Sequence, residues 1–210
     1  MTFLASAINI FGYDGVNLMR VSKEKAAENR QALLEAASRK FRKDGIDGVG
    51  VAEIANEAGL THGAIYAHFP SKEALAAEAF SFGFAKSMED TQAWANEHGA
   101  SFDDFVKVLM SRRMRDKIDD GCPMTASASE ISRQSLDLSL RFKDAFEELA
   151  ATIAAPLTGH TTAAEKRRLS VAAVAAQIGA IAVARAVLKA DEALSEEVLS
   201  AVRETFLVTP

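Results

Sequence analysis

Apolar residues recur every three or four positions along most of this chain, which is the spacing of an amphipathic helix. Leu33, Ala37 and Phe41, for instance, follow one another at fourfold spacing among charged residues. The pattern predicts helices over about 22–44, 51–58, 62–69, 71–96, 101–110, 123–155, 163–190 and 195–208. Residues 112–121 are charged and end in glycine, which indicates a loop or a frayed turn. β-Branched residues rarely alternate with polar ones, so the predicted fold class is all-α.

Two short helices around a tight turn are predicted in the first third of the chain. Val51, Ile54, Ala55 and Ala58 occupy positions i, i+3, i+4 and i+7, so they form an apolar stripe on the first of these helices. Gly59 follows directly and is expected to end that helix, because glycine readily takes the left-handed conformation that closes a helix. The stripe is the surface through which the two helices are expected to pack.

The second short helix has an apolar inner face and an almost bare outer face. Thr61 precedes it and is a good N-cap, because its hydroxyl can accept a hydrogen bond from a free backbone N–H. Ile65 and Phe69 are four residues apart and are expected to face the first helix. Gly63 and Ala64 lie on the opposite side. A helix with so little bulk on one face can come close to another surface.

The ends of these helices suit a negatively charged surface. His62 lies at a positive helix N-terminus, where phosphate oxygens are favoured. Ser71 is expected to cap a third helix, whose first turn carries Lys72. The arrangement is a helix-turn-helix, which places the N-terminal part of its second helix in the DNA major groove. The predicted DNA contacts are Thr61, His62, Gly63, Ala64, Tyr66, His68 and Lys72, of which the last three act mainly on phosphates.

The same residues carry a resemblance to a known family. The sequence AGLT at residues 58–61 and the sequence YAHFPSKEAL at residues 66–75 are similar to the DNA-binding domain of the TetR/AcrR family of bacterial transcriptional regulators. Family members usually have Thr or Ser near the start of the first motif helix. This chain has Val49 and Gly50 there, so that position is left out of the predicted contacts.

The resemblance implies a fold and a mechanism. It implies a three-helix DNA-binding domain over residues 20–70 and a larger helical domain over residues 71–210 for ligand binding and dimerisation. Separately, the sequence MRVSK at residues 19–23 looks like a natural start, so residues 1–19 are expected to be an extension without function that is disordered or lightly docked. A homodimer would bind a palindromic operator in double-stranded DNA, most often as a repressor. A small-molecule inducer packed against the helix that starts near residue 71 would tilt that helix and release the DNA.

Charge and cysteine content fit this picture. The net charge of −5 argues against non-specific binding of nucleic acid, but residues 20–75 hold nine Lys and Arg against eight Asp and Glu, while residues 76–210 hold fifteen against twenty. One cysteine allows no intramolecular disulfide, which suits a reducing cytoplasm. No apolar run reaches the roughly 20 residues of a membrane span, so we expect a cytoplasmic protein without a membrane partner.

The first helix carries basic residues on its outer face. These are interleaved with glutamates, so two interpretations remain open: a solvated face of ion pairs, or an approach of the N-terminal cations to the DNA backbone. The residues are Lys23, Lys25, Arg30, Lys40 and Arg42.

Small residues on the helix over 163–190, with the apolar residues of the last helix, predict a dimer interface in the form of a four-helix bundle. The alternative is a helix buried within its own subunit. The predicted interface residues are Ala173, Ala176, Ala180, Ala184, Val202 and Phe206.

Aromatic and methionine side chains of the middle region are candidates for a ligand pocket, although such stripes are more often plain core. The chosen residues are Phe84, Met88, Phe105, Met110 and Phe142.

Two alternatives to a ligand-released repressor remain. Cys122 follows Gly121 at a helix start, where the helix dipole would lower the pKa of the thiol and allow redox or electrophile sensing. The small-residue helices would also suit a dimeric protein-interaction scaffold. No metal site, cofactor site or catalytic constellation is predicted, so we do not expect an enzyme.

Overall fold

The chain folds entirely into helices. The structure is a computed structural model, and it describes residues 23–157 and 162–207. Within these ranges it contains no strand, which confirms the all-α prediction. The extension over residues 1–19 lies outside the described residues. The helices are α1 (Lys23–Asp44), α2 (Val51–Glu57), α3 (His62–Tyr66), α4 (Lys72–His98), α5 (Phe102–Leu109), α6 (Arg112–Asp116), α7 (Pro123–Ile131), α8 (Leu136–Ala154), α9 (Ala163–Val187) and α10 (Glu192–Leu207).

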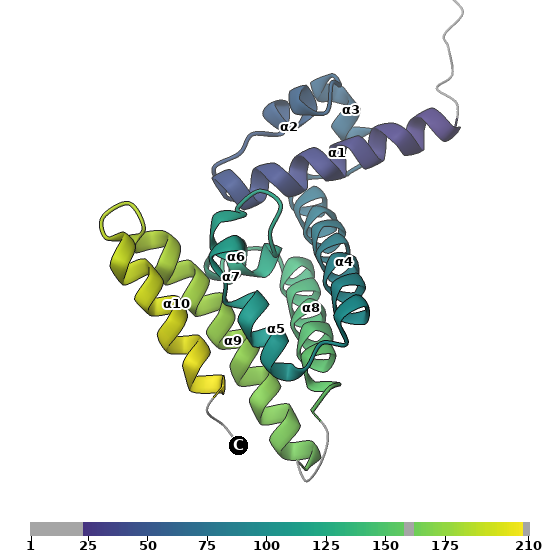
Figure 1. Ribbon diagram of the computed structural model, residues 1–210. Coiled ribbons are helices and arrows are strands. Elements are labelled where there is room, and N and C mark those ends of the chain that lie inside the picture. The colour runs from purple at the N-terminus through teal and green to yellow at the C-terminus, as the bar shows by residue number, and fades with distance from the viewer. Residues whose placement is uncertain (1–22, 158–161, 208–210) are drawn as a thin grey trace, which may run out of the picture.

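The first three helices form a unit at one end of the molecule, and α4 runs from it into the larger helical part (Figure 1). α1 lies across the start of α4, and its buried residues include Leu33, Ala37 and Phe41, as the fourfold spacing predicts. Gly83 marks the point of closest approach, because a Cβ there would lie 2.9 Å from Arg42 Nη1 and closer still to Ser38 Oγ. A side chain at position 83 would therefore displace the side chains of Ser38 and Arg42 on α1.

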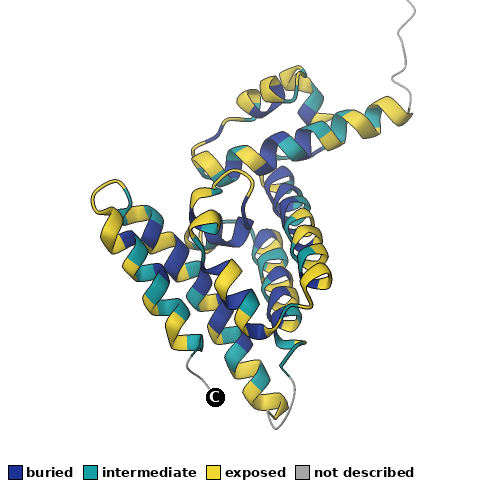
Figure 2. Cartoon of the chain, viewed as in Figure 1, coloured by how far each residue is buried: buried dark blue, intermediate teal, exposed yellow. Residues whose placement is uncertain are grey.

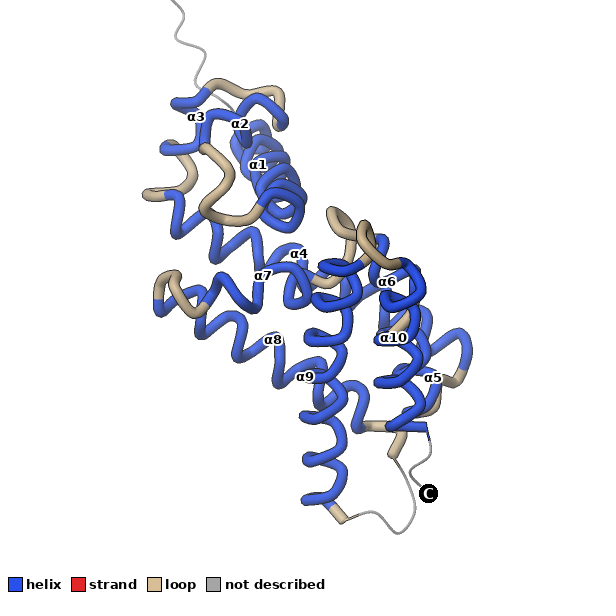
Figure 3. The backbone as a smooth tube through the Cα atoms, turned by 90° about the vertical axis from the view of Figure 1, so that its left-hand side faces the viewer, coloured by secondary structure: helices blue, strands red, loops and turns tan. Residues whose placement is uncertain are grey.

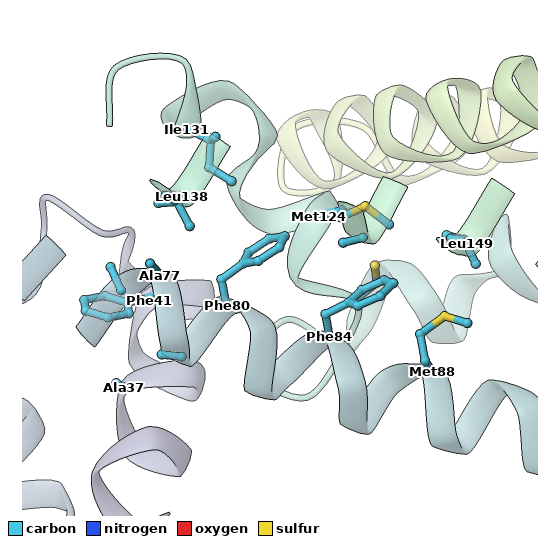
Figure 4. Packing of buried hydrophobic residues seen from close by; sticks show 14 of the residues in the cluster. Ala37, Phe41, Ala77, Phe80, Phe84, Met88, Met124, Ile131, Leu138 and Leu149 are labelled. Atoms are coloured by element: carbon cyan, nitrogen blue, oxygen red, sulfur yellow. The ribbon is translucent and has the colours of Figure 1, made fainter. Parts of the chain in front are cut away.

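One continuous hydrophobic cluster extends from the α1–α3 unit into the larger part. Figure 4 shows Phe80, Phe84 and Met88 in a row on one side of α4, facing residues such as Met124 of α7 and Leu149 of α8. The division at residue 70 therefore stays a prediction about function, because the buried core runs through both parts.

α9 and α10 lie side by side on the flank away from α4 (Figures 1 and 3). By length and composition α9 alone among the described helices is apolar enough to cross a membrane, whereas no such segment is expected from the sequence. About 39% of its most apolar window is buried inside the protein. The core helix of a soluble protein passes the same test, so this feature by itself is weak evidence of a membrane span.

Three predicted elements differ from the structure. α3 ends at Tyr66, because the backbone N–H groups of His68 and Phe69 both bond Ile65 O and turn the chain. The long helix over 123–155 is two helices, separated by a turn after Ile131 and restarted by a Ser135 cap. Residues 112–116, expected to be a loop, form α6.

Candidate functional site

The helix-turn-helix forms as its apolar stripe predicts. Ile54, Ile65 and Phe69 are completely buried at its centre. Gly59 has a φ of +69°, and the turn it makes is closed by a hydrogen bond of 2.9 Å from Leu60 N to Ala55 O. These contacts fix α3 relative to α2 and leave the opposite side of α3 without neighbours.

The outer face of α3 is exposed (Figure 2), and Gly63 and Ala64 add little bulk to it. Thr61, His62 and Gly63 are exposed, and Tyr66 is 52% exposed. The rings of His62 and Tyr66 meet edge to face, with centroids 5.5 Å apart. A Cβ on Gly63 would meet nothing within 4 Å, and the backbone there has no positive φ. The fold itself therefore gives no reason for glycine at position 63.

The caps of these short helices are only partly as expected. Gly50 is the N-cap of α2, and its N–H donates a hydrogen bond of 3.2 Å to Glu53 Oε1. Thr61 occupies the N-cap position of α3, but its hydroxyl makes no capping hydrogen bond. Ser71 does cap α4, accepting from Ala74 N at 3.2 Å. The hydroxyl of Thr61 is thus left available to an external partner.

Most of the basic residues of α1 form ion pairs or hydrogen bonds within the protein. Arg30 pairs with Glu78 and lies over the ring of Phe69, with its guanidinium carbon 4.9 Å from the ring centroid. Lys40 lies 3.5 Å from Asp44 Oδ2. This favours the interpretation of the α1 face as a network of ion pairs.

Lys72 is different from these cations. It is half-buried at the first position of α4 and forms no ion pair with any of the residues described. His68 and Ala64 are half-buried nearby in sequence. The predicted contacts from Thr61 to Lys72 are therefore all at least partly accessible, and their role in DNA binding stays a prediction.

Polar contacts that the sequence did not indicate tie α1 and the loop after it to the larger part. Arg42 Nη1 donates to Gly121 O at 3.1 Å. Glu130 Oε2 on α7 accepts from Ile46 N at 3.2 Å, and Gln134 Nε2 donates to Asp47 Oδ1 at 3.0 Å. Desolvation lowers the pKa of Arg42. The partners are 79 to 87 residues apart, so no local pattern could have revealed them.

A groove of about 560 Å³ lies between α4 and α8. Phe84 and Met88, predicted to line a pocket, line it. Phe105 and Met110 do not; they are buried in the core, the alternative that the sequence left open. Phe142 is half-buried and packs against Phe80, with ring centroids 5.9 Å apart, without lining the groove.

The predicted dimer contacts divide in a similar way. Ala173, Ala180 and Ala184 are buried within their own subunit, so they cannot form the predicted interface. These three residues lie on the apolar face of α9, and that face packs on the core of the same subunit. Ala176, Val202 and Phe206 are half-buried against the core. The exposed face of α9 carries a second row of small residues, together with the exposed Val183. The small residues are Ala172, Ala175, Gly179, Ala182 and Ala186.

Cys122 is the N-cap of α7, followed by a proline, as the sequence indicates. Its environment does not favour sensing. The residue is only 5% exposed, and burial raises the pKa of the thiol, although Arg42 and Arg185 act in the opposite direction. Desolvation of the thiolate therefore outweighs the helix dipole that the sensor hypothesis relied on.

We expect the Cys122 thiol to be protected in the folded protein. Iodoacetamide at pH 7.5 should alkylate it about a hundredfold more slowly than in the unfolded chain, because attack requires the thiolate and access to it. Mass spectrometry at timed intervals, with and without denaturant, measures both rates. Equal rates would restore the sensor hypothesis.

Two family profiles match the chain. Residues 33–79 match the bacterial regulatory proteins of the tetR family, and residues 99–198 match the C-terminal domain of LmrA/YxaF-like transcriptional regulators. The first covers the helix-turn-helix and the start of α4. The second covers most of the larger part, from the end of α4 into α10.

Individual proteins agree with the profiles. The chain is 43% identical over 61 residues to the HTH-type transcriptional regulator AcrR of Shigella flexneri, an alignment that spans 29% of this chain and 28% of that relative. It is 29% identical over 128 residues to the HTH-type transcriptional regulator LmrA of Bacillus subtilis, spanning 59% and 68%. The fold matches a TetR-family regulator from Cytophaga hutchinsonii with a TM-score of 0.71 and 20% identity, over 89% of this chain and 98% of that one. The chain belongs to the TetR family of bacterial transcriptional regulators.

Proposed function

We propose that this regulator is a cytoplasmic repressor that binds a palindromic operator as a homodimer and leaves it when a small molecule binds. Regulation of transcription follows from the family, whose members are not enzymes. Repression, operator binding and release by a ligand are our proposal for this chain.

The observation that carries the proposal is the outer face of α3. It is exposed, it has no carboxylate, and it contains a glycine that the fold does not require. A bare helix face allows the backbone to approach base edges closely, and Ala64 can contact a thymine methyl. Thr61 and His62 at the N-terminal end, with Tyr66, His68 and Lys72 beside them, would hold the phosphates and position the helix.

One recognition helix gives little affinity, so the proposal includes a dimer. Two such helices about 34 Å apart would read the two halves of a palindrome. The exposed row of small residues on α9, from Ala172 to Ala186, lets a second helix come close, and a two-fold axis would pair it with its own copy. The dimer contact is thus proposed on this face.

Release is proposed to act through α4. Its first turn carries Lys72 and its middle lines the groove against α8, so a ligand in the groove would bias the position of α4 at the DNA. Such a ligand changes operator affinity only by its difference in affinity for the two positions of α4.

The test is binding to an operator duplex selected from random DNA, titrated in salt against a scrambled duplex. We expect tight, selective binding of two chains per duplex. Lys72→Ala should weaken binding to both duplexes similarly and reduce the salt slope by about one unit per subunit, because each Lys72 releases about one counterion. Lys107→Ala on α5 removes the same charge far from α3 and should change neither value. A change of sequence preference in Lys72→Ala would contradict the phosphate assignment.

A further inference from the structure

The groove between α4 and α8 has an apolar floor. Phe80, Phe84, Met88 and Ala145 line it, and each is at most 8% exposed. The first three lie in a row on the side of α4 that faces the core (Figure 4). A volume of about 560 Å³ is within the range of small-molecule sites in proteins. The groove can therefore accept the apolar body of an organic molecule.

The rim of the groove is polar and mostly acidic. Glu89 and Gln92 of α4 lie at the rim, and α8 contributes Asp144, Glu148 and the cation Arg141. Three carboxylates therefore face one guanidinium.

Some of these charged groups already form ion pairs within the protein. Arg141 Nε is 3.1 Å from Asp137 Oδ2, and its Nη1 donates to Ser81 Oγ at 3.1 Å. Asp144 is 3.1 Å from Lys143 Nζ. Arg141, the cation of the rim, thus already has an acidic partner, and Asp144 already has a basic one.

Glu89 and Glu148 have no such partner. Neither forms an ion pair with any other residue in 23–157 or 162–207, and both are exposed, one from each wall of the groove. The two unpaired carboxylates and the aromatic rings of the groove each favour a positively charged ligand. A carboxylate attracts a cation directly, and the face of a phenylalanine ring attracts it through the ring quadrupole. An anion would be repelled by both.

We propose that this groove binds a hydrophobic organic cation, with its charged centre between Glu89 and Glu148 and its apolar groups on Phe80, Phe84 and Met88. This names the class of the inducer and rests on the proposed function for its effect on DNA, but not for binding itself.

The test uses two probes of nearly equal shape and opposite charge, tetraphenylphosphonium and tetraphenylborate, by isothermal titration calorimetry on the full chain. Tetraphenylphosphonium should bind at least tenfold more tightly. The double variant Glu89→Gln, Glu148→Gln should lose at least tenfold in tetraphenylphosphonium affinity and should not lose affinity for tetraphenylborate.

A matched variant controls for net charge. Glu97→Gln, Glu204→Gln removes two exposed carboxylates outside the groove, and its tetraphenylphosphonium affinity should stay within twofold of the parent protein. Equal binding of the two probes, or equal losses in the two double variants, would overturn the proposal.

Operator binding of the protein without any probe separates this proposal from the proposed function. If the operator is bound but tetraphenylphosphonium is not, the ligand class is wrong and the repressor stands. If tetraphenylphosphonium binds through Glu89 and Glu148 but no duplex is bound selectively, the proposed ligand class is supported and the proposed repressor function is wrong.

Discussion

Replacing Gly83 by valine should lower the free energy of unfolding by about 2–3 kcal/mol, because the new side chain has no room where α1 crosses α4. A Cβ at position 83 would already be 2.9 Å from Arg42 Nη1 and closer to Ser38 Oγ. The long side chain of Arg42 can move, but Ser38 is short and buried on α1. Either the Ser38 hydroxyl must rotate into packed surroundings or the helices must separate, and chemical denaturation followed by circular dichroism measures the cost.

A double-mutant cycle with Ser38 shows whether the crossing is the cause. The buried hydroxyl of Ser38 has no hydrogen-bond partner among the residues described, so Ser38→Ala alone should be neutral or slightly stabilising. Gly83→Ala should cost less than valine, and Ser38→Ala should recover part of that loss. If the two alanine substitutions are strictly additive, the close contact at the crossing is not the source of the effect.

Replacing Arg185 by alanine should cost about 3 kcal/mol, because it leaves three partly buried carbonyl oxygens without this donor. Arg185 on α9 donates to Arg115 O at 2.8 Å, to Met114 O at 2.9 Å and to Lys117 O at 3.1 Å. These carbonyls lie at the C-terminal end of α6, where a cation is also favoured by the helix dipole. Thermal unfolding should show the loss, and exchange of the α6 amides should accelerate most.

Arg133, in the turn that follows α7, is a matched control. It donates to a single exposed carbonyl, Ser129 O, at 3.1 Å, so Arg133→Ala should change the free energy of unfolding by less than about 0.5 kcal/mol. Arg185→Lys should fall between the two, since an ammonium lacks the planar fork of a guanidinium. Equal costs for Arg185→Ala and Arg133→Ala would show that α6 does not depend on its cap from α9.

The contacts of Arg185 also explain why α6 could not be predicted from the sequence. A helix of five residues is too short to form alone, and residues 112–121 carry no apolar periodicity, so a loop was the reasonable expectation. α6 exists because Arg115 is buried against Ser195 and Glu196 and because Arg185 caps it, contacts that span 68 to 81 residues. Local patterns contain no trace of such partners.

The helix-turn-helix was predictable for the opposite reason. Its stripe, its glycine turn and its caps lie within residues 50–75, where neighbours in sequence are neighbours in space. Even there, the N-cap position of Thr61 followed from the sequence, but its free hydroxyl did not.

An alanine-rich helix shows a further limit. Small residues lie all round α9, so periodicity could not decide which face meets the core and which meets a partner. The structure buries the row that contains Ala173, Ala180 and Ala184. Cys122 is similar, since its position at a helix start was predictable and its burial was not.

Gly63→Ala, with two readouts on one protein, shows whether the outer face of α3 enters the DNA groove. Alanine fits the fold and is the better helix former, so the free energy of unfolding should rise by about 0.5–1 kcal/mol. Affinity for the selected operator should fall about tenfold, because the added methyl group prevents the close approach. A protein that becomes more stable and binds the operator as tightly as before would contradict the claim.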